Sequence, residues 1–139
     1  MRWLRARRPI WLLANLWLLL YFDHTGLVRV GLLAALLHES GHVLAWLLLT
    51  RTPPVLRLHG GGIALDVSTR PLARRQTFIL AAAGPLSNLL FCGGTLLFMQ
   101  HRASYWGYFF AAANLALALF NLLPFGMLDG KRLLTALRR

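Results

Sequence analysis

Hydrophobic residues are concentrated in four long runs, separated by short polar stretches that contain glycine or proline. The runs cover Pro9–Phe22, Leu27–Thr50, Gln76–Met99 and Tyr105–Leu123. A helix needs about 20 mostly apolar residues to cross the hydrocarbon core of a bilayer. The second run is long enough, whereas the first is short unless Trp3 and Leu4 extend it. The pattern predicts an all-α polytopic membrane protein with about four transmembrane helices.

The period of the hydrophobic pattern changes between the second and third runs. Apolar and polar residues alternate over Val55–His59 and again over Ile63–Val67, on either side of Gly60–Gly62. Two short runs of period two around a glycine turn are typical of a β-hairpin. We therefore expect a small membrane-associated hairpin between the second and third helices. Residues 1–139 are treated as a single membrane-embedded domain because the length suits one domain better than two.

Composition and charge place the chain in a membrane. Hydrophobic residues make up 58% of the sequence and the net charge is +11. Ordinary soluble domains are about 45–50% apolar. The basic residues cluster before the first run, in the loop after the second and at the end of the chain, as Arg2, Arg5, Arg7, Arg8, Arg51, Arg57, Arg70, Arg74, Arg75, Lys131, Arg132, Arg138 and Arg139.

This alternation between loops is the positive-inside signature, so both termini and the long loop are expected in the cytosol. The predicted location is the cell (inner) membrane, with the lipid bilayer as a partner. Nucleic acid is not expected as a partner, because the charges do not gather on one soluble face. No small-residue cleavage site follows the first run at Tyr21–Asp23, so we interpret that run as a retained span and not a signal peptide.

The second run contains His38-Glu39-Ser40-Gly41-His42, a cluster of ionisable residues inside a transmembrane segment. Histidines at i and i+4 lie on one helical face and can bind one metal ion, typically zinc. Glu39 can act as general base toward a water activated by that metal. An ionisable residue at membrane depth costs about 2.5–3.5 kcal/mol on insertion scales. A metal site explains this cluster better than a helix that holds three titratable groups by chance.

A third protein ligand must come from elsewhere, because tetrahedral zinc binds three protein ligands and a water in catalytic sites. The remaining acidic residues are Asp23, Asp66 and Asp129. Asp23 lies in an outer turn and Asp66 on the predicted hairpin. Asp129 follows an irregular stretch with Pro124 and Gly126, a type of break tolerated at membrane depth where it lines a cavity. Two interpretations of Asp129 stay open, a metal ligand and the N-cap of a short basic helix.

The chain resembles the site-2 protease family of intramembrane zinc metalloproteases. The resemblance rests on His38–His42, on Gly84-Pro85-Leu86-Ser87-Asn88 in the third run, on Asn121–Gly130, and on the glycine-rich hairpin. It covers Leu27 to Leu133 and implies that His38, His42 and Asp129 bind zinc and that Glu39 is the general base.

The resemblance also places Asn88 near the site, in contact with substrate or the developing oxyanion. The alternative for Asn88 is a hydrogen bond between helices. Gly84 and Pro85 are expected to serve close helix packing and a kink.

The implied activity is hydrolysis of peptide bonds within or near transmembrane segments of substrate proteins. Gly61 and Gly62 are expected substrate contacts, where the edge of the hairpin would hold an extended substrate by strand addition. The chain ends within ten residues of Asp129, a minimal form of the family that implies possible self-association or a regulatory membrane partner. The alternative is a catalytically silent membrane protein that binds client transmembrane helices, although such a protein has no need of Glu39.

Overall fold

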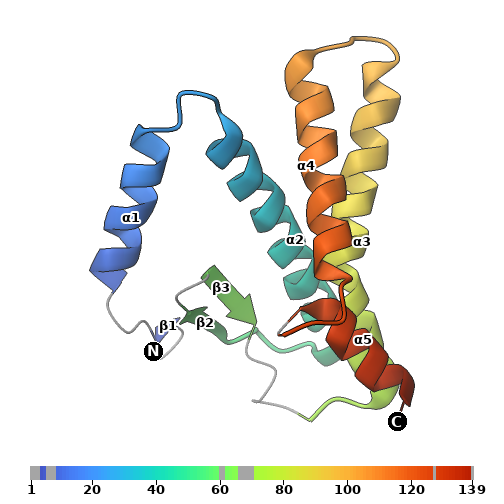
Figure 1. The fold of residues 1–139 in the computed structure, drawn as a ribbon. Coiled ribbons are helices and arrows are strands. Elements are labelled where there is room, and N and C mark those ends of the chain that lie inside the picture. The colour runs from blue at the N-terminus through green and yellow to red at the C-terminus, as the bar shows by residue number, and fades with distance from the viewer. Residues whose placement is uncertain (1–3, 6–8, 60–61, 66–70, 127, 139) are drawn as a thin grey trace.

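A computed structural model describes residues 4–5, 9–59, 62–65, 71–126 and 128–138 (Figure 1). In chain order the elements are β1 (Leu4–Arg5), α1 (Pro9–Tyr21), α2 (Leu27–Thr50), β2 (Leu56–His59), β3 (Gly62–Leu65), α3 (Arg74–Met99), α4 (Tyr105–Asn121) and α5 (Asp129–Arg138). α2 coincides with the second hydrophobic run, and α3 and α4 follow the third and fourth closely.

The ends of the long helices follow from local chemistry. Gly26 precedes α2 with a φ of 73°, and an added Cβ there would collide with the ring of Trp106. The turn therefore requires glycine both for its left-handed backbone and for the close approach of α4. The backbone N–H of Gly107 donates to the Ser104 hydroxyl (3.1 Å), a side-chain cap of the α4 N-terminus.

Helices α2, α3 and α4 pack side by side, while α1 stands apart from this bundle (Figure 1). The core is narrow and consists largely of small residues, with Ala34, Ala81, Ala111 and Ala118 each buried almost completely. Large side chains point outward, as at Leu48 (73% exposed). Small interior residues and large exposed apolar ones are the distribution expected of helices that pack in lipid.

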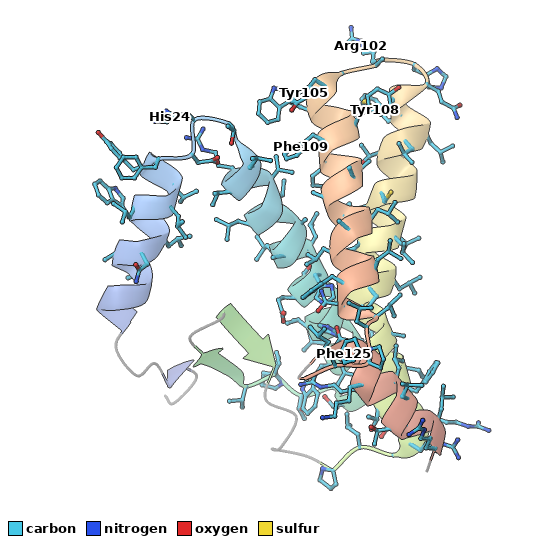
Figure 2. The ribbon with its side chains drawn as sticks, in the orientation of Figure 1. His24, Arg102, Tyr105, Tyr108, Phe109 and Phe125 are labelled. Carbon is cyan, nitrogen blue, oxygen red and sulfur yellow. The ribbon has the colours of Figure 1, made fainter. Side chains whose placement is uncertain are left out.

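Aromatic side chains mark the two ends of the apolar surface of α4. Tyr105 and Tyr108 lie near the turn that carries Arg102, and Phe125 lies at the opposite end, beside α5 (Figure 2). Tyr105 is 74% exposed and Phe125 is 66% exposed. Tyrosine is enriched at the level of the lipid headgroups, where its polar hydroxyl meets water.

The predicted fold class is wrong on three points. The described residues form five helices and not about four, because the residues after the fourth run form α5. The predicted two-stranded hairpin is not present as an isolated unit. β2 and β3 pair antiparallel, with Leu58 opposite Ile63, but β1 adds to β2 in parallel and makes a three-stranded sheet. Pairing of residues about fifty positions apart is invisible in local sequence patterns.

The third correction concerns the number of spans. Among the described residues, two helices are long and apolar enough to cross a membrane by length and composition, α2 and α3. α4 has 17 residues, a length of about 26 Å, which is less than the roughly 30 Å of a bilayer core. The described part of α1 is shorter still, with 13 residues.

Candidate metal centre

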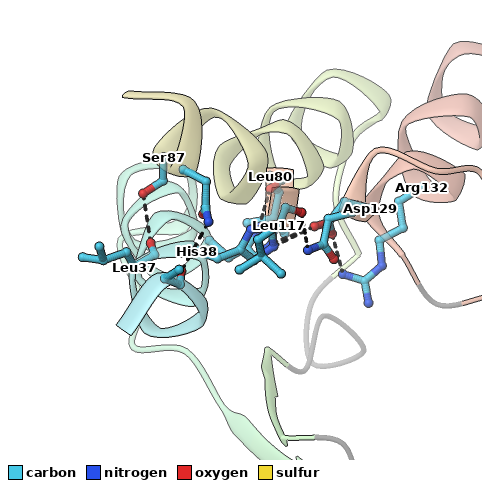
Figure 3. A network of polar contacts seen from close by, with 11 residues as sticks. Leu37, His38, Leu80, Ser87, Leu117, Asp129 and Arg132 are labelled. Carbon is cyan, nitrogen blue, oxygen red and sulfur yellow. Dashed lines mark hydrogen bonds and ion pairs between the residues drawn. The ribbon is translucent and has the colours of Figure 1, made fainter. Parts of the chain in front are cut away.

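Three predicted site residues meet where Asp129, the first residue of α5, reaches the middle of α2. Nε2 of His38 lies 3.0 Å from Oδ2 of Asp129, and Nε2 of His42 lies 3.1 Å from the same oxygen. The two Nε2 atoms are 3.1 Å apart. The two histidines share a face of α2 because they are four residues apart, and Asp129 reaches them from a distant part of the chain (Figure 3).

All three side chains are removed from solvent, with relative exposures of 4% for His38, 6% for His42 and 4% for Asp129. Nδ1 of His42 lies 2.8 Å from the carbonyl oxygen of Leu80, which can only accept. Nδ1 therefore carries the hydrogen, and Nε2 of His42 presents its lone pair to Asp129 and His38. A backbone carbonyl that orients a ligating imidazole in this way is a common feature of metal sites.

This donor set fits a zinc ion. Two imidazole nitrogens and one carboxylate oxygen are zinc ligands in catalytic sites. Ligand atoms about 2.0–2.2 Å from a tetrahedral zinc lie roughly 3.3–3.6 Å from one another. The observed separations of 3.0 and 3.1 Å are within a few tenths of that range. Acceptor atoms that face each other inside a buried cluster are stabilised by a cation between them.

Asp129 is held in place by the first turn of α5. An added Cβ at Gly130 would lie 2.6 Å from the carbonyl oxygen of Leu123 and closer still to that of Leu122, so the Asp-Gly pair lets α5 begin against the end of α4. Nη1 of Arg132 lies 3.8 Å from Oδ1 of Asp129. Burial would raise the pKa of Asp129, but the neighbouring His38 and His42 lower it to about 2. Asp129 is the first residue of α5 and faces the two histidines, and its role as a metal ligand stays a prediction.

Gly84 borders the centre from α3. A Cβ added at Gly84 would lie 2.5 Å from Nε2 of His38 and would also overlap Nε2 of His42. Gly84 therefore packs closely, as predicted, but its neighbours are the two imidazoles. Gly41, in contrast, faces the backbone of α3, where a Cβ would lie 2.7 Å from the carbonyl oxygen of Ala83. Sequence reasoning missed the link of Gly84 to the centre and the carbonyl of Leu80.

The other predicted site residues lie around this cluster. Glu39 is half-buried on the same turn of α2, within electrostatic range of His42, His38 and Asp129. Asn88 is fully buried one turn beyond Gly84, and its side-chain amide donates to the carbonyl oxygen of Ala34 (3.3 Å). Asn88 thus makes the predicted hydrogen bond between helices.

One of the two predicted substrate contacts, Gly62, belongs to the sheet and not to the cluster. Gly62 is the first residue of β3, and β3 is at the edge of the described sheet. Gly61 and Asp66 lie outside the described residues.

Comparison with solved structures gives a likeness in fold. The chain is similar in structure to a site-2 protease from Methanocaldococcus jannaschii, with a TM-score of 0.67 and 23% sequence identity over 91% of this chain. The match covers 62% of the archaeal protein, so this chain spans less than two thirds of its length. No family model and no curated protein matches. The likeness shows a shared fold.

Proposed function

We propose that this chain is an intramembrane zinc metalloprotease, which hydrolyses peptide bonds within or near the transmembrane segments of other proteins. The observation that carries the proposal is the convergence of His38, His42 and Asp129, with ligand atoms 3.0–3.1 Å apart in a buried cluster. The shared fold with a site-2 protease supports the same activity.

In the proposed mechanism, His38, His42 and Asp129 hold the metal. A bound zinc ion supplies Lewis acidity, which polarises a peptide carbonyl and lowers the pKa of a water molecule. Glu39 is one residue from the first ligand and half-buried, so its carboxylate can accept a proton from the attacking water. Glu39 then donates this proton to the amide nitrogen that leaves when the peptide bond breaks.

The substrate contacts belong to the same proposal. Asn88 is proposed to bind the substrate or the developing oxyanion, since only one of the two hydrogens on its amide nitrogen is needed for the bond to Ala34. Gly61 and Gly62 are proposed to lie beside the extended substrate. The active form is proposed to self-associate or to bind a regulatory membrane partner.

We further propose that the chain is integral to the cell membrane, with both termini in the cytosol. Helices α2 and α3 are suited to cross the bilayer. β1, near the N-terminus, and α5, near the C-terminus, lie at the same end of the helices (Figure 1). Basic residues among those described concentrate in elements at that end, in the first turn of α3 (Arg74 and Arg75) and in α5 (Lys131, Arg132 and Arg138), as the positive-inside rule requires of a cytosolic face.

The test is cleavage of a co-expressed model transmembrane substrate, measured together with zinc content in wild type and in Glu39→Gln. The variant keeps the size and shape of the side chain but cannot act as a base. We expect zinc in both proteins and a loss of cleavage of about 10²–10⁴-fold in the variant. Bound zinc without cleavage in the wild type would favour a silent binder of client helices, and wild type without zinc would overturn the proposal.

A further inference from the structure

A second cavity lies beside the metal centre, between the start of α3 and α5. Its volume is about 500 Å³, within the range of ordinary ligand pockets. The lining residues come from both helices and from the segments that precede them, and they are Leu72, Arg74, Thr77, Gly126, Leu128, Lys131, Arg132, Thr135 and Ala136. The ligating histidines are not among them, so the cavity is distinct from the metal centre.

The charged groups of this cavity have a single sign. Arg74, Lys131 and Arg132 line it, and none of the described lining residues carries a carboxylate. Nε of Arg74 donates to the carbonyl oxygen of Ala136 (2.5 Å) and Nη2 to that of Leu137 (2.6 Å), which fixes the guanidinium against the end of α5. A guanidinium has five N–H donors, so Arg74 keeps donors for a ligand.

The other two cations are available to a ligand as well. Within the part of the chain that the structure describes, the ammonium of Lys131 makes no ion pair or hydrogen bond, and the residue is exposed. The guanidinium of Arg132 is 3.8 Å from Oδ1 of Asp129, an ion pair that leaves N–H donors for a ligand. Three cations that line one cavity form a site for an anion of more than one negative oxygen, and phosphate is a group that arginine binds through several hydrogen bonds.

The surface next to the cavity is apolar. Leu134 is 40% exposed and Leu137 is 57% exposed, and the three-residue spacing places them on one side of α5. A helix with one basic and one leucine-rich face lies in the headgroup region of a membrane. Basic pockets between helices on the cytosolic side bind the headgroups of anionic lipids.

We propose that this cavity binds the phosphate group of an anionic phospholipid, with Lys131, Arg132 and Arg74 as the phosphate contacts and Leu134 and Leu137 beside the acyl chains. The site is separate from the proposed proteolytic activity but adjoins it, because Arg132 lies between the cavity and Asp129. A phosphate in the cavity competes with Asp129 for the guanidinium of Arg132, so lipid binding and the metal centre are coupled through one side chain.

The test is binding of short-chain phosphatidylglycerol to the full chain in detergent, followed by native mass spectrometry. Phosphatidylcholine with the same acyl chains is the zwitterionic control, and inorganic phosphate is added as a soluble competitor. Lys131→Gln removes one cation from the cavity, and Thr135→Lys adds one. Arg75→Gln is the matched control, since Arg75 is an exposed cation on the first turn of α3 that does not line the cavity.

We expect wild type to retain phosphatidylglycerol in preference to phosphatidylcholine. Lys131→Gln should weaken this binding about fivefold, the effect of one basic residue near anionic lipid. Thr135→Lys should strengthen it, and Arg75→Gln should leave it close to wild type. Equal effects of Lys131→Gln and Arg75→Gln, or equal retention of the two lipids, would overturn the proposal.

Competition by inorganic phosphate distinguishes the sources of the ligand. Displacement of the lipid only at a large excess of phosphate supports a headgroup site, whereas displacement at comparable concentrations overturns the lipid and leaves a site for a soluble phosphate. None of these measurements needs cleavage or bound zinc. A failure of the lipid site is therefore distinguishable from a failure of the proposed protease.

Discussion

Asp23 and Asp129 are both buried carboxylates, and they lie toward opposite ends of the helices. Asp23 is 6% exposed in the turn between α1 and α2, and Asp129 is 4% exposed at the start of α5. Burial would raise the pKa of Asp23, but hydrogen bonds from the backbone N–H groups of Arg29 and Val28 lower it. The pKa of Asp129 is lowered too. Burial and a low pKa alone therefore do not separate a structural carboxylate from a functional one.

The partners of the two carboxylates do separate them. Asp23 accepts hydrogen bonds from the backbone N–H of Arg29 (3.0 Å) and from the hydroxyl of Thr25 (3.3 Å). Both donors lie within six residues of Asp23 in the sequence. Donors of this kind, with the side chain of Arg29 at 3.8 Å, stabilise the carboxylate and hold the start of a helix. Asp129 instead faces two imidazoles that come from 87 and 91 residues away. Of these, His42 presents a lone pair, which suits a shared cation.

Replacing Asp129 tests the comparison most severely. Asp129→Ala should lose zinc and all cleavage, because two histidines alone leave zinc without its third protein ligand. We expect zinc affinity to fall by more than the roughly 10–100-fold seen when a group that only orients a ligand is removed. The measurement is zinc content and affinity by competition with a chromogenic chelator. Retention of zinc at wild-type affinity would show that Asp129 is only the N-cap of α5.

A second comparison uses two residues of the same type, Asn88 and Asn114. Both are fully buried, and both donate to a main-chain carbonyl, that of Ala34 for Asn88 and that of Phe110 for Asn114. If Asn88 contacts the oxyanion, Asn88→Ala should reduce kcat by about 10²–10³-fold with zinc retained. Asn114→Ala should affect stability only. Equal losses of activity in the two variants, in step with their losses of stability, would assign Asn88 to helix packing.

Gly84→Ala should weaken zinc binding by about 10–100-fold, because the new methyl group displaces both imidazoles from their positions. Gly93→Ala is the matched control on the same helix, since a Cβ there meets nothing within 4 Å. The control should keep zinc and gain up to about 1 kcal/mol of stability from the higher helix propensity of alanine. Zinc affinities that are the same in both variants would mean that α3 can move away from α2 without cost to the site.

These residues also show how far the sequence alone can predict the site. The i, i+4 spacing of His38 and His42 is enough to place them on one face, so that pair could be predicted. The sequence predicts close helix packing at Gly84, but it does not say which face of α3 meets the histidines. The carbonyl of Leu80 orients His42 through its backbone, which carries no residue-type signal at all. The contact of Asp129 with the two histidines depends on how the chain returns after α4, and it joins residues about ninety positions apart.

The same limit applies to the fold. The span of α2 follows from hydrophobic run length and from the Pro53-Pro54 pair that ends it, both local properties. The pairing of β1 with β2 joins Leu4 to Leu56, and no periodicity within either segment predicts the partner. A helix after Asp129 is only one of two interpretations of that stretch from the sequence. A ten-residue basic stretch forms a helix chiefly through packing, here with α3.

Asp23→Asn should have the smallest effect and should leave zinc and cleavage unchanged. It removes the charge but keeps the size of the side chain, so we expect the thermal unfolding midpoint near neutral pH to fall on the order of a few degrees. Since folding lowers the pKa of Asp23 from its ordinary value of 3.8, its charge stabilises the fold above that pH, and the contribution is lost as the pH falls. The difference in midpoint between wild type and variant should therefore shrink on acidification.

Thr25→Val, which removes one hydrogen bond to the same carboxylate, should give a smaller shift in the same direction. A loss of zinc in Asp23→Asn would mean that the outer turn positions the metal centre through α2, and the distinction between the two carboxylates would then fail.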